Sequence, residues 1–333
     1  MKKILHVLAS NKYSGAENVV CTIIEKFKKE YEMAYCSPYG SIEKELKERK
    51  IKYYGIKKLN INELKRIIEK YKPDIIHSHD YTASVISTMT GFKGRIISHL
   101  HINAPFAHNW NIKSILYCLT TSKYYKIVGV SDSVLNEAIF KRKIKDKFVK
   151  IYNYVDKEKI LEKASETKQT KKYDIFYIGR LNDFKNPIEF IEIINELKDN
   201  KIKAVMIGDG ELKEECLKLI KAKKLDEIIE MIGFVKNPYS IINNCKIGIM
   251  PSKVEGFGLT AIESSILNKP VLNTGVGGLK EIFKSNQELI YSTKEECISK
   301  IKEIIKNKKK LTVDITDFCD LKSWKNNIKK LYE

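Results

Sequence analysis

Two glutamates stand eight positions apart in the second half of the chain, around the expected start of a helix. Residues 247–250 are apolar and predict a buried strand, and a turn with two glycines separates them from a helix expected from about residue 259. Glu255 falls in the turn and Glu263 about one turn into the helix. Free amides at a helix start favour an anion, and a carboxylate can accept hydrogen bonds from two vicinal hydroxyls, as of a ribose. Singly, each glutamate also fits a helix-start or surface role, but their combination with strand and turn favours a binding site.

A basic pair follows another expected strand, residues 174–178, in the same half. Arg180 and Lys185 come directly after it. An arginine fork and a lysine point charge both suit phosphate oxygens, and both stabilise negative charge that develops on a leaving phosphate. The second half of the chain therefore predicts a site for a phosphorylated ligand that also carries hydroxyl groups.

These segments resemble the retaining glycosyltransferase family 4, which has the GT-B fold. Residues 255–263 are similar to its E-x7-E region, and residues 179–186 to its G-R-L-x-x-x-K-N segment. Weaker similarities follow in the family's order along nearly the whole chain: 14–17 to G-G-x-E, 130–132 to V-S-x, 153–156 to N-G-V-D, 208–210 to G-x-G, 232–235 to the segment that meets the base, and 269–271 with 275–281 to the strand and turn after the E-x7-E helix.

The resemblance implies a role for each matching residue of the second half. Arg180 and Lys185 would bind the donor diphosphate, and Glu263 would bind the ribose hydroxyls. The backbone near Val235 would meet the base. Glu255 would hold the donor sugar and phosphate together with the backbone amides of Gly256, Phe257, Gly258 and Leu259. Arg180, Lys185 and Glu255 would also count among the catalytic groups.

In the first half the resemblance implies that Gly15 brings loop backbone against the diphosphate. It also implies a catalytic histidine beside the donor sugar, at the end of the strand expected at 95–101. His101 is the first choice and His99, which shares its strand parity, the alternative; a structural role stays open for both. His77 and His79 follow another expected strand, where they could touch the acceptor, although a structural role is favoured.

The sequence predicts a reaction that needs no metal and no cofactor. It contains no D-x-D, the usual carboxylate pair for a metal-bound diphosphate, and Arg180, Lys185 and helix amides can replace the cation. The pair His77 and His79 has no third ligand at a suitable spacing along the chain. A P-loop and a G-x-S-x-G elbow are both absent, which disfavours nucleotide hydrolysis by a P-loop and α/β-hydrolase chemistry.

Short apolar runs alternate with longer amphipathic segments twice along the chain, which indicates two α/β domains with parallel sheets. A polar stretch at 162–172 is the expected linker. We therefore expect a GT-B protein of two doubly wound Rossmann-like domains that face each other across a cleft. The acceptor-side domain spans 1–165 and is completed by a C-terminal helix at 318–333; the donor-binding domain spans 166–317. Within the first domain, Ser131 or Asp132 is expected to cap a helix that runs through residue 140.

The chain has 333 residues, with 61 Lys+Arg against 42 Asp+Glu and a net charge of +19. The basic residues concentrate at 44–72 and 141–147, and suit an anionic partner such as a membrane surface, or simply a solvated surface. Seven scattered cysteines without C-x-x-C disfavour a secreted disulfide framework and a zinc ribbon, and favour a cytoplasmic setting. No apolar run approaches the ~20 residues that span a bilayer.

Together with the resemblance, these features predict a glycosyltransferase that moves a sugar from a nucleotide-diphosphate donor, expected to be a UDP-sugar, to a hydroxyl of a glycan or lipid-linked glycan. Assembly of surface polysaccharide or lipopolysaccharide is the expected setting, on the inner face of the membrane. Two alternatives remain at this point. One is a nucleotide-sugar epimerase of the same fold, and the other is a non-catalytic binder of membrane or nucleic acid. If the protein is a glycosyltransferase, we expect its basic surface to contact a membrane and not nucleic acid.

Overall fold

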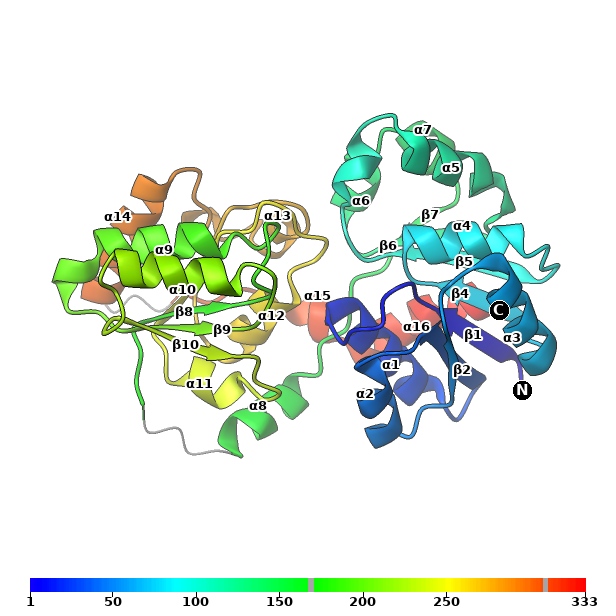
Figure 1. Cartoon of the computed structure of the whole chain (residues 1–333), viewed down its shortest axis with the longest axis horizontal. Coiled ribbons are helices and arrows are strands. Elements are labelled where there is room, and N and C mark those ends of the chain that lie inside the picture. Colours follow the sequence, from blue (N-terminus) through cyan, green and yellow to red (C-terminus); the bar gives the residue numbers. More distant parts are fainter. Residues whose placement is uncertain (167–170, 308–310) are drawn as a thin grey trace. The chain divides into compact units, whose positions relative to one another are not determined.

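The computed structural model describes residues 1–166, 171–307 and 311–333 (Figure 1). The chain forms two compact units. Unit 1 consists of Met1–Asn153 and Lys322–Glu333, and unit 2 of Tyr154–Leu321. Each unit is built on its own parallel sheet, so the predicted two-domain α/β fold is confirmed.

Unit 1 contains a seven-stranded sheet in the order β3-β2-β1-β4-β5-β6-β7. The strands are short apolar runs whose side chains are mostly buried, as expected for strands covered on both faces. The order reverses between β1 and β4, and in such sheets ligands bind outside the carboxyl ends of the strands at this reversal. The bounds are β1 (Lys3–Val7), β2 (Glu32–Pro38), β3 (Tyr53–Ile56), β4 (Ile75–Ser78), β5 (Arg95–Leu100), β6 (Lys126–Gly129) and β7 (Phe148–Lys150).

The helices of unit 1 connect these strands. α3 (Ile61–Tyr71) illustrates how the sequence sets an element: the Asn60 side chain accepts a hydrogen bond from the amide of Glu63 at its start, and Lys72 in the left-handed conformation ends it. The remaining helices are α1 (Gly15–Phe27), α2 (Ile42–Glu48), α4 (Tyr81–Met89), α5 (Ile112–Thr120), α6 (Asp132–Asn136) and α7 (Lys141–Ile144), with 3-10 turns η1 (Pro105–His108) and η2 (Thr121–Lys123).

The last helix, α16 (Leu321–Tyr332), packs within unit 1 although unit 2 precedes it in the chain. The Tyr332 ring lies 5.2 Å from the Tyr31 ring, and the Trp324 ring lies 6.0 Å from that of Phe27. The Lys325 ammonium is 2.7 Å from the Glu30 carboxylate. These contacts attach α16 to α1 and to the turn after it.

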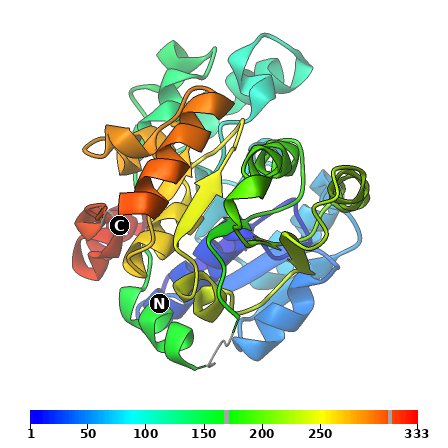
Figure 2. The same ribbon diagram turned by 90° about the vertical axis from the view of Figure 1, so that its left-hand side faces the viewer.

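Unit 2 contains a five-stranded parallel sheet in the order β10-β9-β8-β11-β12. Helices α9 and α10 lie on one face and α11 and α12 on the other (Figures 1 and 2). The strands are β8 (Ile175–Ile178), β9 (Ala204–Ile207), β10 (Ile229–Gly233), β11 (Ile247–Met250) and β12 (Val271–Asn273). The helices are α8 (Lys157–Ser165), α9 (Pro187–Glu196), α10 (Lys213–Ala222), α11 (Tyr239–Asn243), α12 (Leu259–Ile266), α13 (Leu279–Ile282), α14 (Lys294–Asn307) and α15 (Thr316–Cys319), with 3-10 turns η3 (Lys198–Asn200) and η4 (Gln287–Leu289).

The structure divides the chain at other residues than 165 and 318. Unit 2 already starts at Tyr154, because α8 contacts α11 and α12. It extends to Leu321, because the Phe318 ring packs on the Phe257 ring at 5.5 Å. The first four residues of the expected linker at 162–172 are the end of α8, and its residues 167–170 lie outside the described part of the chain.

Four helical segments of unit 1 differ from expectation. The helix expected through residue 140 ends at Asn136, and α4, α5 and α7 were not predicted. The sequence of α4 is rich in serine and threonine, and therefore lacks an apolar stripe. Its serines are nonetheless buried, because the Ser84 hydroxyl bonds that of Ser98 at 2.7 Å and the Ser87 hydroxyl bonds that of Ser78 at 2.9 Å.

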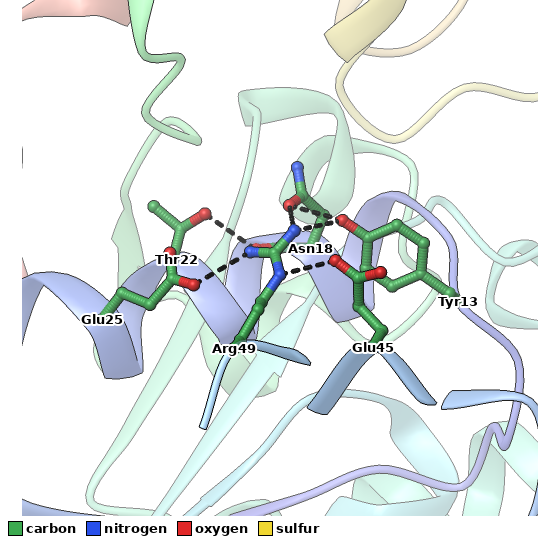
Figure 3. Close-up of polar contacts among 6 residues, drawn as sticks. All are labelled: Tyr13, Asn18, Thr22, Glu25, Glu45 and Arg49. Atoms are coloured by element: carbon green, nitrogen blue, oxygen red, sulfur yellow. Dashed lines mark hydrogen bonds and ion pairs between the residues drawn. The ribbon is translucent and has the colours of Figure 1, made fainter. Parts of the chain in front are cut away.

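A largely buried arginine after α2 connects α2 to α1 and to the loop after β1 (Figure 3). The Arg49 guanidinium donates to the Glu45 carboxylate at 2.7 Å, to the Tyr13 hydroxyl at 2.6 Å and to the Asn18 side-chain oxygen at 3.1 Å. Glu25 forms a longer ion pair at 3.5 Å. The network therefore fixes the position of Tyr13, two residues before α1 begins.

Replacing Arg49 with alanine is expected to lower the free energy of unfolding by about 2–4 kcal/mol, because the change leaves two glutamates near each other without their cation. Urea denaturation of both proteins measures this difference. Arg66→Ala is the matched control, because Arg66 pairs with Glu63 on an exposed surface and should change stability little. Equal effects of the two substitutions would contradict a structural role for the Arg49 network.

Candidate active site

Two loops of unit 2 are joined at the carboxyl edge of its sheet. β8 and β11 are neighbours, so the loops that follow them, 179–186 and 251–258, leave the sheet side by side. The amide of Lys253 donates to the carbonyl of Phe184 at 2.8 Å, and the Lys253 ammonium bonds the Asp183 carboxylate at 2.6 Å. The loop with Arg180 and Lys185 and the loop with Glu255, about 70 residues apart in sequence, thus form one surface.

Lys185 and Glu255 form an ion pair within this surface. Their side chains are 28 % and 11 % exposed, so a ligand could still reach the pair. The buried Tyr177 hydroxyl, which the sequence did not single out, donates to the carbonyl of Arg180 at 3.0 Å and lies 3.4 Å from that of Lys185. Tyr177 therefore holds both ends of the basic loop.

Arg180 lies at the exposed start of the same loop. Within the described part of the chain, its guanidinium has no hydrogen-bond or ion-pair partner. A free guanidinium next to a lysine supplies the charge and the fork geometry that a diphosphate requires. The two basic residues that the sequence singled out are thus at one edge, one paired and one available.

The turn after β9 packs against the backbone of the basic loop. Gly208 has φ +143°, and a Cβ atom there would lie 1.9 Å from the carbonyl oxygen of Gly179. The amide of Leu181 donates to the carbonyl of Asp209 at 3.0 Å. This close approach requires glycine at position 208 and explains the G-x-G pattern as a packing requirement between two turns.

A glycine precedes α12. Gly258 has φ +105°, is buried, and as the N-cap residue has no side chain with which to cap the helix. An N-cap glycine leaves the first amides of α12 without a cap from that position, which suits an anion. The Phe257 ring, by contrast, is buried against Phe318, so only its backbone can take part in binding.

Glu263 lies on α12 in an environment that disfavours its charge. Burial raises the pKa of its carboxyl to about 7, against an opposing hydrogen bond from Tyr239 and the positive charge of Lys163. Tyr239 is on α11 and Lys163 on α8, and neither residue stood out in the sequence. A carboxylate whose pKa stays raised, because its hydrogen bond and neighbouring positive charge do not offset the burial, is typical of a binding or catalytic site.

Val235 follows β10 by two residues and is partly exposed. Its strand is at the outer edge of the sheet, with β9 between it and the basic loop after β8. Since all strands are parallel, Val235 is at the same carboxyl edge as Arg180, Lys185 and Glu255. Unit 2 therefore places the loops that carry Arg180, Lys185, Val235 and Glu255 at one edge of one sheet, and Glu263 on the helix that follows.

In unit 1, Gly15 is the first residue of α1 and is exposed. The loop before it, after β1, is held by the Arg49 network through Tyr13. The Ser14 hydroxyl donates to the Glu17 carboxylate, which is buried. Gly15 thus lies at a helix start, at the carboxyl side of β1.

The expected histidine at the end of β5 belongs to a larger cluster. His101 is partly exposed, whereas His99 is buried at 2 % exposure and hydrogen-bonded to His77. Of the two candidates, His101 is therefore the one that a substrate could reach. Its Nδ1 atom is nonetheless buried, and burial of the ring lowers the pKa of His101.

The cluster corrects the statement that His77 and His79 lack a third metal ligand. His6 is on the neighbouring strand β1, and His6, His77 and His79 each have a ring nitrogen within 4.8 Å of the other two. His79, His99 and His101 form a second such group. His6 lies 71 residues before His77 in sequence, and His99 and His101 lie on or directly after the next strand, β5. A rule that looks for ligands at short spacings along the chain could not find them.

Unit 1 also carries an exposed apolar helix. Five large apolar side chains here are between 44 % and 78 % exposed. Four belong to α5 and one, Trp110, lies two residues before it; the four are Ile112, Ile115, Leu116 and Leu119. The exposed basic residues Lys141, Arg142 and Lys143 of α7 are nearby, because the ring of Tyr117 in α5 lies 5.2 Å from that of Phe140 (Figure 1). The other basic stretch, 44–72, is at the opposite edge of the sheet.

The surface around α5 is not a membrane-spanning segment. Throughout the described ranges, no helix has the length and the apolar composition needed to cross a bilayer. The helix α5 itself has nine residues, about two and a half turns. Its apolar side chains therefore form a surface feature of unit 1.

Comparison with known proteins covers nearly the whole chain. Residues 13–159 match the family model "Glycosyltransferase Family 4", and residues 158–316 match "Glycosyl transferases group 1". The O-antigen biosynthesis glycosyltransferase WclY of Escherichia coli is 27 % identical over 297 residues, which cover 84 % of this chain and 82 % of that protein.

Two further similarities concern a lipid-linked substrate and a bound nucleotide. A Campylobacter jejuni protein named N-acetylgalactosamine-N,N'-diacetylbacillosaminyl-diphospho-undecaprenol 4-alpha-N-acetylgalactosaminyltransferase is 28 % identical over 312 residues, covering 86 % of this chain and 85 % of that one. The crystal structure of Anabaena Alr3699/HepE in complex with UDP and glucose superposes with a TM-score of 0.87 at 16 % identity, covering 100 % of both chains. At this identity the superposition establishes the shared fold.

The raised pKa of Glu263 predicts a pH-dependent stability. Its folded pKa of about 7 exceeds the ordinary value of 4.5, so the stability of the protein falls as pH rises between these values and is lowest above them. Glu263→Gln removes this penalty and should raise the free energy of unfolding by about 2–3 kcal/mol at about pH 8, with no gain near pH 4.5. Thermal denaturation across this range measures the difference.

Glu215→Gln is the control, because Glu215 is an exposed carboxylate on α10. It should leave the pH profile of stability unchanged. A gain from Glu263→Gln that is the same at both pH values would mean that desolvation of the charge is not its cause.

Proposed function

The chain is a glycosyltransferase of the GT-B fold, and on this premise we propose that it transfers a sugar from a UDP-sugar to a hydroxyl of a lipid-linked glycan, with retention of the anomeric configuration. The observation that carries the proposal is the ion pair of Lys185 with Glu255 at the edge of the unit 2 sheet, in the loop that also carries the exposed Arg180. The helix α12, which carries Glu263, follows the loop that contains Glu255.

The donor diphosphate binds by an exchange of partners. Lys185, now paired with Glu255, turns to the phosphate oxygens, and the free guanidinium of Arg180 binds them beside it. Glu255 is thereby released to accept hydrogen bonds from hydroxyls of the donor sugar. The amides from Gly256 to Leu259 add dipoles directed at the phosphate. These groups replace a metal cation on the diphosphate.

In the transfer step, the bond between the anomeric carbon and the phosphate oxygen breaks while a bond to the acceptor oxygen forms on the same face. The acceptor proton goes to the departing phosphate oxygen. Arg180, Lys185 and the α12 amides stabilise the negative charge that builds on the nucleoside diphosphate. In unit 1, His101 is the histidine that we propose as the catalytic one, because it is the more exposed of the two candidates.

Uridine is the base that the available similarity supports. The Anabaena structure with the same fold was solved with UDP and glucose. The ribose hydroxyls would bind the Glu263 carboxylate, and the backbone near Val235 would meet the uracil. A carboxylate poised at a pKa of about 7 accepts two hydrogen bonds best above that pH.

A glycan on a membrane lipid diphosphate is the acceptor we propose. The Campylobacter jejuni relative is named for a diphospho-undecaprenol substrate, and the Escherichia coli relative for O-antigen biosynthesis. The apolar face of α5, bordered by the basic residues of α7, fits an anionic bilayer: apolar side chains enter the acyl boundary and cations attract the headgroups. We therefore place the enzyme on the inner face of the membrane, in surface polysaccharide assembly.

Substitution of the two lysines near the paired loops tests the donor site. Lys185→Ala should lower kcat/KM by about 10²–10³-fold, because it removes a cation that stabilises the leaving diphosphate. Lys253→Ala is the matched control: Lys253 is exposed, pairs with Asp183 in the same region, and should change kcat/KM by less than about threefold.

The same assay separates transfer from epimerisation. NMR of the product reports the anomeric configuration, and incubation of the UDP-sugar without acceptor reports any change of the donor sugar itself. An inverted product would contradict the retaining mechanism. A rearranged free UDP-sugar with no glycoside formed would identify an epimerase.

Flotation with vesicles containing anionic phospholipid tests the membrane surface. Leu119→Glu places a carboxylate on the exposed face of α5 and should weaken binding by about tenfold or more. Leu161→Glu is the control: it makes the same substitution at an exposed leucine on α8 of unit 2. This variant should bind as the unaltered protein does. Equal binding of all three proteins would contradict a contact through α5.

A further inference from the structure

Five of the chain's six histidines lie on one face of the unit 1 sheet, at the carboxyl ends of three adjacent strands. His6 is paired with His77 across β1 and β4, and Ser78 with Ser98 across β4 and β5. Since neighbouring residues of a strand point to opposite faces, this register directs the histidines to the same side. They are His6, His77, His79, His99 and His101.

The imidazoles form two hydrogen-bonded chains. In one, His79 joins its neighbours: its Nε2 is 2.9 Å from His6 Nδ1, and its Nδ1 is 3.0 Å from His101 Nε2. In the other, His77 Nδ1 is 2.8 Å from the Tyr332 hydroxyl and its Nε2 is 3.2 Å from His99 Nδ1. The rings of His99 and His101 stack at 4.2 Å, so the two chains are in contact.

The proton count of these chains leaves buried nitrogens without a partner. A neutral imidazole has one N–H and one lone pair, so a chain of them ends in a donor at one side and an acceptor at the other. The terminal nitrogens are His6 Nε2, His99 Nε2 and His101 Nδ1, and each is buried without a partner in the described part of the chain. Buried polar atoms without partners are uncommon in native proteins and indicate a missing ligand or strain.

We infer that His79, His99 and His101 bind one divalent transition-metal ion, with an imidazole nitrogen from each as ligand. One ring nitrogen of each lies within 4.8 Å of one nitrogen of the other two. Two ligand nitrogens of a tetrahedral zinc ion are roughly 3.3 Å apart, given Zn–N distances near 2.0–2.1 Å. His79 Nδ1 and His101 Nε2, at 3.0 Å, need to separate by only a few tenths of an ångström.

The remaining nitrogens supply the hydrogen bonds that metal-bound histidines usually make. With the metal on His79 Nδ1, the N–H at Nε2 donates to His6; with the metal on His99 Nε2, the N–H at Nδ1 donates to His77. His77 in turn donates to the oxygen of Tyr332. Such outer hydrogen bonds orient the ligands and fix their tautomers.

The group His6, His77 and His79 is a less suitable site. All three rings are buried, with exposures of 1 % or less, whereas His101 is reached by solvent. An ion can therefore arrive at the second group through His101 and keep a water molecule as a fourth ligand. Because both groups share His79, only one ion binds at a time.

Three neutral nitrogens favour Zn²⁺, Co²⁺, Ni²⁺ or Cu²⁺ over Mg²⁺ or Ca²⁺.

Titration of the full chain without a polyhistidine tag with Co²⁺ tests the inference directly, independently of any transferase assay. One equivalent should produce visible d–d absorption of a nitrogen-ligated ion, which Zn²⁺ then abolishes. At a metal concentration of about 100 times Kd, Tm should rise by roughly 5 °C. Mg²⁺ at the same concentration should have no effect.

Variants identify the ligands. His101→Gln, at the partly exposed position, and His99→Gln should each weaken Co²⁺ binding more than about 100-fold, since losing even an outer hydrogen bond costs 10–100-fold. His6→Gln retains an acceptor for His79 and should weaken binding about tenfold at most. His108→Gln changes the one histidine outside the cluster and should bind as the unaltered protein does. Tm without metal shows which variants are folded.

Three results would overturn the inference. The first is no saturable Co²⁺ absorption in the unaltered chain. The second is a strong near-ultraviolet charge-transfer band, which would assign the metal to cysteine thiolates. The third is equal loss of binding in His6→Gln and His99→Gln, which would assign the metal to the buried group. If a variant fails to fold, the Zn²⁺-induced change of the histidine side-chain NMR signals in the unaltered chain decides instead.

Discussion

Parallel pairing of every strand is the constraint on which both halves of the molecule depend. Because the carboxyl ends of parallel strands meet at one edge, each loop that leaves a strand in the same direction is brought beside its neighbours. Lys185 and Glu255 become partners through β8 and β11, and the histidines of unit 1 become a cluster through β1, β4 and β5. Neither grouping needs proximity in sequence, only the register of adjacent strands.

The same arrangement of loops and helices explains why Glu263 and Lys185 in unit 2 have so few partners of opposite charge. On α12, partial burial raises the pKa of Glu263, and Lys185 is paired with one carboxylate, that of Glu255. A site that bound its own charges fully would have no free energy left for a ligand. The glycines at 208 and 258 serve this arrangement by letting backbone, which has fixed dipoles, take the place of flexible side chains.

The sequence predicted those parts of the structure that follow from local pattern. The two α/β units, the basic loop and the glutamate helix all have apolar periodicity and turn residues that identify them. The helix α4 was missed because its buried face is made of serines that bond to β4 and β5, a feature that exists only after folding. The histidine cluster was missed for a related reason, since its third ligand is set by strand register. The supporting residues Tyr177 and Tyr239 carry no signal in sequence, because a tyrosine in an apolar segment is ordinarily part of the core.

The position of α16 has a consequence for how the chain folds as it is synthesised. The Tyr332 hydroxyl contacts His77 from 255 residues away, and α16 buries Trp324, Ile328, Leu331 and Tyr332 in unit 1. During translation, unit 1 emerges first but lacks this helix until all of unit 2 has left the ribosome. Unit 2 is contiguous and has no such dependence, so it can reach its final structure first. Until then, the aromatic side chains of unit 1 that pack against α16, among them Phe27 and Tyr31, lack that cover.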